Sequence, residues 1–207
     1  IMSGRYALFN WPEALGQLPG FPQHMRAHWN LAPKSQVLML YQNEGQRHAA
    51  LALWGFTSSW MTDLTRAVAH ARVETVNTLP MFQNAWRKQR CLLPANGFFE
   101  WRGVQRKQPF WLSANEPLLY FAGLWDVYAV PGHDYYSVAL LTQQAAHLRR
   151  PIILNQQQQQ LWLDPESSDE QLREVLASAE QPQLHERRVS TLINDPLVDG
   201  PHCLNTG

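Results

Sequence analysis

The stretch Leu92-Leu93-Pro94-Ala95-Asn96-Gly97-Phe98-Phe99-Glu100-Trp101 is apolar and aromatic almost throughout, which predicts a buried strand on which the fold is organised. We expect the strand over residues 98–101, with Gly97 as a bend or bulge just before it. Because side chains alternate along a strand, Phe98 and Glu100 share one face, while Phe99 and Trp101 share the other. The sequence therefore places one carboxylate among large aromatic rings.

Glu100 is that carboxylate, and the residue pattern allows two interpretations. Burial among aromatic rings disfavours the charged form, which would let the group hold and pass a proton near neutral pH. Glu100 is then a candidate catalytic acid or base. The alternative is a structural carboxylate at a strand edge, paired with Arg102 or Arg106.

The composition indicates a single globular unit. Of 207 residues, 45% are hydrophobic and 16% charged, and no segment resembles a linker, so we expect one domain over residues 1–207. Nine Trp, eight Phe and six Tyr suit a β-rich fold and supply flat surfaces on which bases or sugars could stack. The formal net charge is zero, so any contact with nucleic acid would depend on a local cluster of Arg and Lys.

The spacing of cysteine and histidine does not indicate a metal centre. Cys91 and Cys203 are far apart and form no C-x-x-C motif, which fits a reducing cytoplasm better than a disulfide framework or zinc knuckle. His24 and His28 could share a helix face, but no third ligand lies near them in sequence. No apolar run approaches transmembrane length, and the start lacks a signal-peptide pattern. We expect a cytoplasmic protein without metal, cofactor or membrane contact.

Periodicity along the chain predicts a mixture of short strands and helices. We expect strands over residues 6–9, 36–41, 49–56, 109–112, 118–124, 135–142, 152–154 and 186–189. Helices are expected over residues 11–18, with Asn10 as N-cap, over 80–89, through the glutamine run 156–160 into Leu161 and Trp162, and from Ser168 to about Ser178 with Gln171 in a capping box.

Two further segments carry groups suited to a site. The expected loop 54–65 contains Trp54 and Trp60, which either bind a ligand or cap the end of the sheet. In the extended segment 69–74, alternation puts His70, Arg72 and Glu74 on one face, as in a lined site or a solvated edge.

The order of motifs resembles the SRAP domain, the SOS response-associated peptidase family of abasic-site processing proteins. The resemblance spans most of the chain and rests on Gly4-Arg5-Tyr6-Ala7, Asn30-Leu31-Ala32-Pro33, Trp54-Gly55-Phe56, Ala71-Arg72-Val73-Glu74-Thr75, Met81-Phe82, Gly97-Phe98-Phe99-Glu100-Trp101, Lys107-Gln108-Pro109-Phe110, Ala122-Gly123-Leu124-Trp125 and His147-x-Arg149-Arg150-Pro151-Ile152-Ile153-Leu154. It implies an α+β fold, a single domain built on a distorted, mostly antiparallel β-barrel with peripheral helices.

The resemblance also implies a chemistry at the N-terminus. In that family the nucleophile is the cysteine after the initiator methionine, exposed by autocatalytic removal of that methionine. Its α-amine condenses with the aldehyde of an opened abasic sugar, and the thiol then closes a thiazolidine that crosslinks protein to DNA. Here we expect the natural chain to begin at Met2, so that Ser3 takes the place of the cysteine.

By the same resemblance, the site residues divide into two groups. Glu100 and His147 would be the acid and base of ring opening and closure, and His70 takes the place of an active-site asparagine. The partner is single-stranded DNA containing abasic sites, with the protein on the nucleoid when bound. Its expected contacts are Arg5, Asn30, Trp54, Trp60, Arg72, Thr142, Arg149 and Arg150.

Departures from the family pattern leave three functions open. A serine hydroxyl is a poorer nucleophile than a thiol, and the oxazolidine it could form hydrolyses more readily, so Ser3 argues against a stable crosslink. The segment 142–147 looks shortened, which could withdraw His147 from the site. The chain is then an abasic-site crosslinking or lyase enzyme of the SOS response, a module that only binds single-stranded DNA, or a peptidase on other proteins. It carries neither G-x-S-x-G nor H-E-x-x-H.

Overall fold

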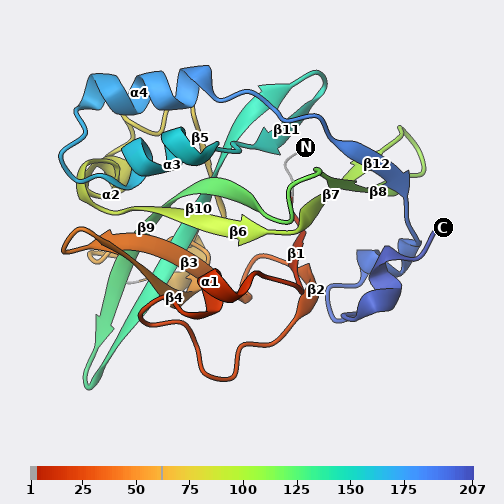
Figure 1. Cartoon of the computed structure of the whole chain (residues 1–207), viewed down its shortest axis with the longest axis horizontal. Coiled ribbons are helices and arrows are strands. Elements are labelled where there is room, and N and C mark those ends of the chain that lie inside the picture. The colour runs from red at the N-terminus through yellow and green to blue at the C-terminus, as the bar shows by residue number, and fades with distance from the viewer. Residues whose placement is uncertain (1–3, 62) are drawn as a thin grey trace.

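Five strands form a closed, distorted barrel in this computed structural model, which describes residues 4–61 and 63–207 (Figure 1). They are β3 (Gln36–Asn43), β4 (Gln46–Trp54), β6 (Arg90–Ala95), β9 (Leu119–Val130) and β10 (His133–Ala145). The ring closes because β9 and β10 also pair with each other, and every pairing in it is antiparallel except β4 with β10. The expected mostly antiparallel barrel is confirmed.

Two short strands extend the barrel along β10. One, β5 (His70–Arg72), pairs with Leu140–Thr142 in parallel, and the other, β11 (Leu148–Pro151), forms an antiparallel hairpin with the end of β10. The sequence indicated no strand at β11. The strand expected over residues 152–154 is reduced to one bridge between Ile153 and Phe121.

A second sheet carries the stretch that contains Glu100. Its order is β12 (His185–Arg188), β8 (Gln108–Ser113), β7 (Gly97–Arg102), β1 (Tyr6–Leu8) and β2 (His28–Leu31). The alternation expected in β7 is confirmed. Phe98 packs into the main core, whereas Phe99 belongs to a smaller core with Trp111 and Ile193.

The helices lie outside the barrel, as expected (Figure 1). They are α1 (Glu13–Gly16), α2 (Gln83–Lys88), α3 (Gln156–Leu163) and α4 (Asp169–Ser178), with 3-10 turns η1 (Leu64–Arg66), η2 (Pro80–Phe82), η3 (Thr191–Asn194) and η4 (Pro201–Leu204). The capping box of Ser168 and Gln171 is confirmed. Asn10 is not an N-cap, because Asn96 bonds both its backbone N–H and its carbonyl and so keeps it in a loop.

One buried cation attaches the helices to the barrel. Arg90 is 4% exposed and donates to the carbonyl oxygens of Trp86, Trp162 and Asp164 at the ends of α2 and α3. Burial lowers its pKa to about 10, and the Asp164 carboxylate opposes this shift. The guanidinium satisfies carbonyls that lack partners at helix ends.

The expected helix face of His24 and His28 is absent. His28 begins strand β2, and its Nδ1 lies 2.8 Å from a carboxylate oxygen of Asp199. The described residues contain no group of three or more His, Cys, Asp or Glu arranged to hold a metal. No helix among them is long and apolar enough to span a membrane.

Candidate functional site

The start of the described chain enters the fold beside Glu100. Strand β1 pairs antiparallel with β7, with Tyr6 opposite Phe98, and the Phe99 N–H donates to the Arg5 carbonyl over 3.0 Å. Continuing this register aligns Gly4 with Glu100. Ser3, the expected nucleophile, lies outside the described residues.

Glu100 is a buried carboxylate paired with two arginines. It is 4% exposed, and Arg150 donates to its oxygens from Nε at 2.5 Å and from Nη2 at 3.2 Å. Arg102 donates to Oε1 from Nε at 3.3 Å and from Nη2 at 3.0 Å. The structural pairing with Arg102 is therefore present, and two cations as well as aromatic rings surround the carboxylate.

Glu186 adds a second carboxylate on the outside of this pair of arginines. Its oxygens accept from Nη1 and Nη2 of Arg102 at 2.9 and 2.8 Å, and Nη2 of Arg150 lies 3.5 Å away. The hydrogen bonds from Arg102 hold the pKa of Glu186 below its usual range. We call these four residues, Glu100, Arg102, Arg150 and Glu186, the Glu100 cluster.

The Glu100 cluster joins the two sheets. Its members come from β7 and β12 of the second sheet and from β11, which extends the barrel. Only Arg150 of the four was expected at the DNA surface and only Glu100 in catalysis. Alternation from Glu100 predicts Arg102 on the same face, but no sequence signal brings Glu186 to it.

Trp54 supports His70 from inside the core. The indole is 1% exposed, packs against the Tyr6 ring at 5.2 Å and donates from Nε1 to the Ala69 carbonyl over 2.8 Å. The His70 ring meets it edge-on at 5.7 Å. Trp54 thus has almost no surface for a DNA strand, contrary to the expectation, and its position at the end of β4 corrects the predicted loop.

Arg149 and Thr142 are also internal. Arg149 is 5% exposed and forks onto Glu74 with distances of 3.1 and 2.8 Å, while its Nε donates to Oγ1 of Thr142, which is fully buried. The hydrogen bonds from Arg149 to Glu74 hold the pKa of Glu74 below its ordinary value. Arg149 therefore fastens β11 to the turn after β5, and its neighbour Arg150 points to Glu100.

His147 does not meet Glu100 in this structure. It is exposed at the tip of the β10–β11 hairpin, where Ala145 pairs with Leu148 and Ala146 has a φ of 53°. No hydrogen bond or ion pair joins it to any residue of the described ranges. A two-residue turn leaves no slack to fold the imidazole back toward Glu100.

Arg5 and Asn30 lie on the opposite face of the second sheet. Arg5 donates to Oδ1 of Asn30 at 3.1 Å and to the Ile193 carbonyl, and its guanidinium lies 5.5 Å from the Trp101 ring centroid. Asn30 is 4% exposed and donates to the Val198 carbonyl over 2.8 Å. Both residues anchor the C-terminal segment, so the structure separates them from the Glu100 cluster.

Arg72 and Trp60 are the expected DNA contacts that remain exposed. Arg72 ends β5, one residue beyond Ala71. Trp60 is 68% exposed in a loop that Asp126 holds by accepting from the Ser59 N–H over 3.1 Å. Both remain predictions as DNA contacts.

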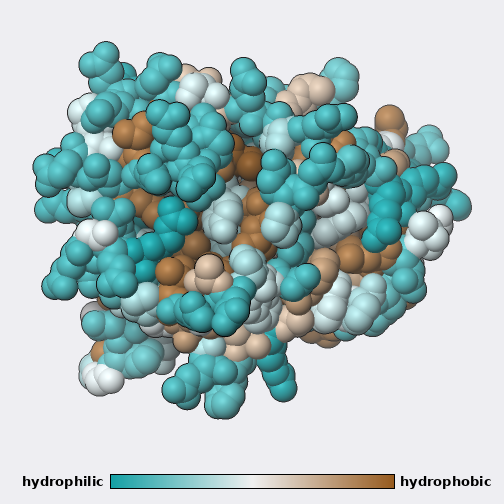
Figure 2. All heavy atoms as spheres, viewed as in Figure 1, coloured by the Kyte–Doolittle hydropathy of each residue, from teal (hydrophilic) through white to brown (hydrophobic). Residues whose placement is uncertain are grey.

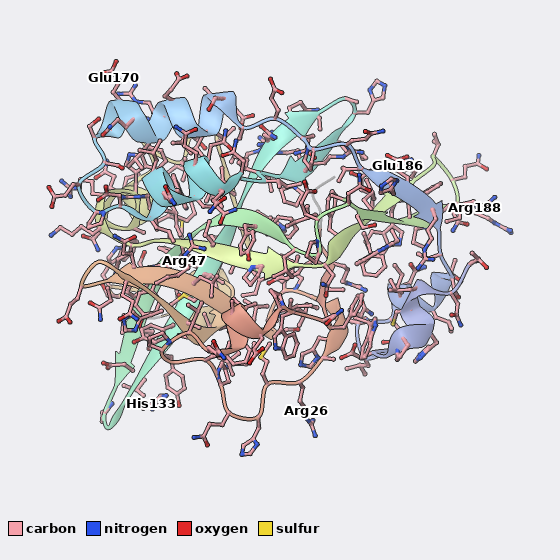
Figure 3. All side chains as sticks on the ribbon, in the orientation of Figure 1. Arg26, Arg47, His133, Glu170, Glu186 and Arg188 are labelled. Carbon is pink, nitrogen blue, oxygen red and sulfur yellow. The ribbon has the colours of Figure 1, made fainter. Side chains whose placement is uncertain are left out.

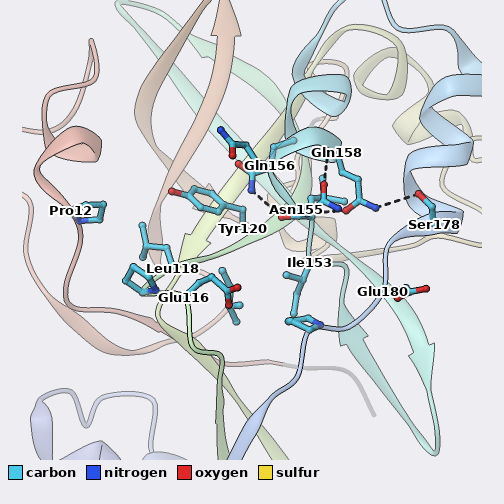
Figure 4. A pocket seen from close by; sticks show the side chains of 15 residues that line it. Pro12, Glu116, Leu118, Tyr120, Ile153, Asn155, Gln156, Gln158, Ser178 and Glu180 are labelled. Carbon is cyan, nitrogen blue, oxygen red and sulfur yellow. Dashed lines mark hydrogen bonds between the residues drawn. The ribbon is translucent and has the colours of Figure 1, made fainter.

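Grooves also occur on other parts of the described surface. One, with a volume of about 560 Å³, runs between the start of β9 and the N-terminus of α3 and is lined in part by Tyr120, Asn155 and Ser178 (Figure 4). None of the described residues expected in the site lines it. Figure 2 shows a largely hydrophilic surface, with hydrophobic side chains visible between the helices and the barrel.

Comparisons with known proteins extend over nearly the whole chain. A protein-family model described as "SOS response associated peptidase (SRAP)" matches residues 2–196. Abasic site processing protein YoqW of Bacillus subtilis is 26% identical over 225 residues, which cover 99% of this chain and 100% of the relative. Abasic site processing protein YedK of Escherichia coli is 28% identical over 158 residues, with 72% and 70% of the two chains covered.

The fold has solved counterparts as well. A structure from Bacteroides thetaiotaomicron superposes with a TM-score of 0.77 at 19% identity, covering 89% of this chain and 87% of that one. The barrel is therefore shared with a protein of quite different sequence. Because the family match leaves out only Ile1 and the last eleven residues, this chain belongs to the SOS response associated peptidase (SRAP) family.

Proposed function

We propose that this protein processes abasic sites in single-stranded DNA through its N-terminal amine, once Met2 has been removed. The observation that carries the proposal is the register of β1 on β7, which brings Gly4, the first described residue, alongside Glu100. The names of the relatives, abasic site processing proteins, support the substrate.

The chemistry follows from the groups near that chain start. An α-amine with a pKa of about 7.7 to 8.0 is partly neutral at physiological pH. Its nitrogen attacks the aldehyde carbon of the opened sugar, and the resulting carbinolamine loses water to give an imine. Glu100 takes up the proton that the attacking amine releases and passes it to the departing hydroxyl, and the arginines of the Glu100 cluster orient its carboxylate.

Ser3 determines how long the adduct lasts. Addition of its hydroxyl oxygen to the imine carbon would close an oxazolidine, with the hydroxyl proton passing to the imine nitrogen. This ring hydrolyses more readily than the thiazolidine that a cysteine forms. We therefore expect a reversible imine as the main covalent species, and Met2–Ser3 as the peptide bond cut by the peptidase activity in the family's name.

Borohydride trapping tests this proposal. The reagent adds hydride to the imine carbon and leaves a stable secondary amine between protein and DNA. We expect a trapped species with abasic single strands and none with intact strands. Acetylation of the N-terminus should abolish trapping without abolishing DNA binding. Absence of trapping from protein with a free Ser3 amine refutes the enzymatic function.

A binding module without chemistry is the second candidate. It is favoured by the exposed position of His147 on a hairpin tip and by the engagement of both Glu100 oxygens by arginines. A module would bind single strands in a salt-sensitive way and yield no trapped species. The same experiment therefore separates the two functions.

A further inference from the structure

The arrangement of Arg102 in the Glu100 cluster resembles a phosphate site that is already filled. One edge of the guanidinium, Nε and Nη2, faces Glu100, and the other edge, Nη1 and Nη2, forks onto Glu186 at 2.9 and 2.8 Å. Arginine forks match carboxylates and phosphates with the same two-oxygen geometry. Glu186 therefore occupies the position that a phosphate would take.

The two edges differ in their access to solvent. Glu100 has a side chain 3% exposed, whereas that of Glu186 is 39% exposed and that of Arg102 is 32% exposed. Arg102 also lies 4.4 Å from the centroid of the Phe110 ring, which fixes the plane of its guanidinium. A ligand from solvent can reach the outer edge without disturbing the pairing with Glu100.

Strand β12 is suited to release its carboxylate. All four of its residues are exposed, and among the described strands it pairs only with β8, at the end of the second sheet. Figure 3 labels Glu186 and Arg188 on this strand. Exposed ion pairs contribute little stability, so breaking the contact with Glu186 requires little free energy. The pair of Glu74 with Arg149 differs, because Arg149 is buried and would lose a needed partner.

We propose that Arg102 and Arg150 form a binding site for a DNA backbone phosphate, and that Glu186 fills this site in the free protein as a competing anion. This inference rests on the proposed function, since it places the phosphate next to Glu100. Phosphate binding exchanges one anion for another at the outer edge of Arg102 and leaves Glu100 oriented. Glu186 thereby sets the strength of DNA binding.

The variant Glu186→Gln tests the proposal, with Glu170→Gln as its control. Both changes add one unit of net charge, but Glu170 lies on α4 at the far side of the molecule (Figure 3). Fluorescence anisotropy with abasic and intact single strands, over a range of KCl concentrations, gives the affinity. We expect Glu186→Gln to bind both strands roughly 3- to 5-fold more tightly at low salt, the scale of one exposed ion pair. The slope of log K against log salt should steepen by up to about 0.7.

A second variant and a second ligand define the site. The double change Arg102→Gln with Glu186→Gln should lose the gain in affinity. Inorganic phosphate at constant ionic strength should shift the unfolding temperature no more than chloride does. A phosphate-specific shift with unchanged DNA binding would assign the site to a free anion and overturn the DNA assignment.

The outcomes separate this inference from the proposed function. If Glu186→Gln binds no more tightly than Glu170→Gln, the phosphate site is refuted, whatever borohydride trapping shows. If it binds more tightly but no imine is trapped, the phosphate site stands and the enzymatic function fails. Protein that binds no single-stranded DNA at all overturns both.

Discussion

The carboxylate of Glu100 is defined by its burial and by two arginines. The side chain is buried, and Arg102 and Arg150 provide the hydrogen bonds that a buried anion requires. A carboxylate held in this way has a defined orientation toward the start of β1. The same contacts would also suit a purely structural ion pair, so a kinetic measurement has to separate the two roles.

Glu100→Gln keeps the shape of the side chain but removes the proton. We expect the rate of borohydride-trapped adduct formation to fall by about 10²-fold, at the low end for general acid-base catalysis, with DNA affinity almost unchanged. Single-turnover trapping at saturating abasic DNA measures this rate, and circular dichroism checks folding. An unchanged rate in folded protein would make Glu100 structural.

Arg72 is the exposed cation at the end of β5. We expect Arg72→Ala to weaken binding of abasic and intact single strands equally and to lower the salt slope by about one unit, since a phosphate contact carries no lesion information. Salt titrations of both strands provide the measurement. A loss confined to abasic DNA would contradict a phosphate contact.

The β10–β11 hairpin determines the partners of its two neighbouring arginines, Arg149 and Arg150. Alternation along β11 turns Arg149 toward Thr142 and Glu74, and Arg150 toward Glu100. The same hairpin places His147 at its exposed tip. Register and turn length thus give two neighbouring arginines different partners.

His147→Ala tests the consequence for catalysis. Because the imidazole makes no contact with Glu100 in the described structure, we expect the trapping rate to change by less than about 2-fold, well below the 10²-fold or more of an acid-base group. The comparison with Glu100→Gln uses the same single-turnover assay. A fall as large as that of Glu100→Gln would mean that the hairpin rearranges when DNA binds.

Acid should weaken the hairpin through Glu74. Arg149 lowers the folded-state pKa of Glu74, so its contribution to stability is present above the unfolded-state pKa and is lost as pH falls through the folded-state value. We expect the unfolding midpoint in urea to fall from about pH 5 downward. Glu74→Gln should be less stable at pH 7 and show a shallower acid dependence. Equal pH profiles would refute this role.

The second sheet packs between the barrel and the C-terminal segment. One face of the second sheet meets the barrel through Phe98, and the other is covered by residues that follow β12, including Val189 and Ile193. Arg5 and Asn30 belong to the covered face. Their side chains hold the end of the chain in place, away from the Glu100 cluster.

Asn30→Ala should therefore change stability and leave function intact. The change leaves the carbonyls of Asp195 and Val198 without their donor, which costs about 2 to 3 kcal/mol. Urea unfolding measures this loss. Trapping rate and salt slope, measured well below the unfolding transition, should match the wild type. A loss of DNA affinity in folded protein would restore Asn30 to the DNA surface.

The local features and the family could be predicted from the amino-acid sequence alone. Alternation in residues 98–101 predicted the two faces of β7, the capping box predicted the start of α4, and the order of motifs predicted the barrel. These are properties of neighbouring residues, which periodicity and hydrogen-bonding groups report directly.

Contacts between side chains that are distant in sequence could not be predicted, because they depend on how the strands pair. Glu186 reaches Arg102 because β12 docks on β8, and Trp54 is buried because β5 and β1 lie over it. Asn30 is turned to the C-terminal segment, and the short β10–β11 turn carries His147 away from Glu100. Such contacts join residues tens of positions apart, and strand register, which the local pattern leaves open between partners, fixes them.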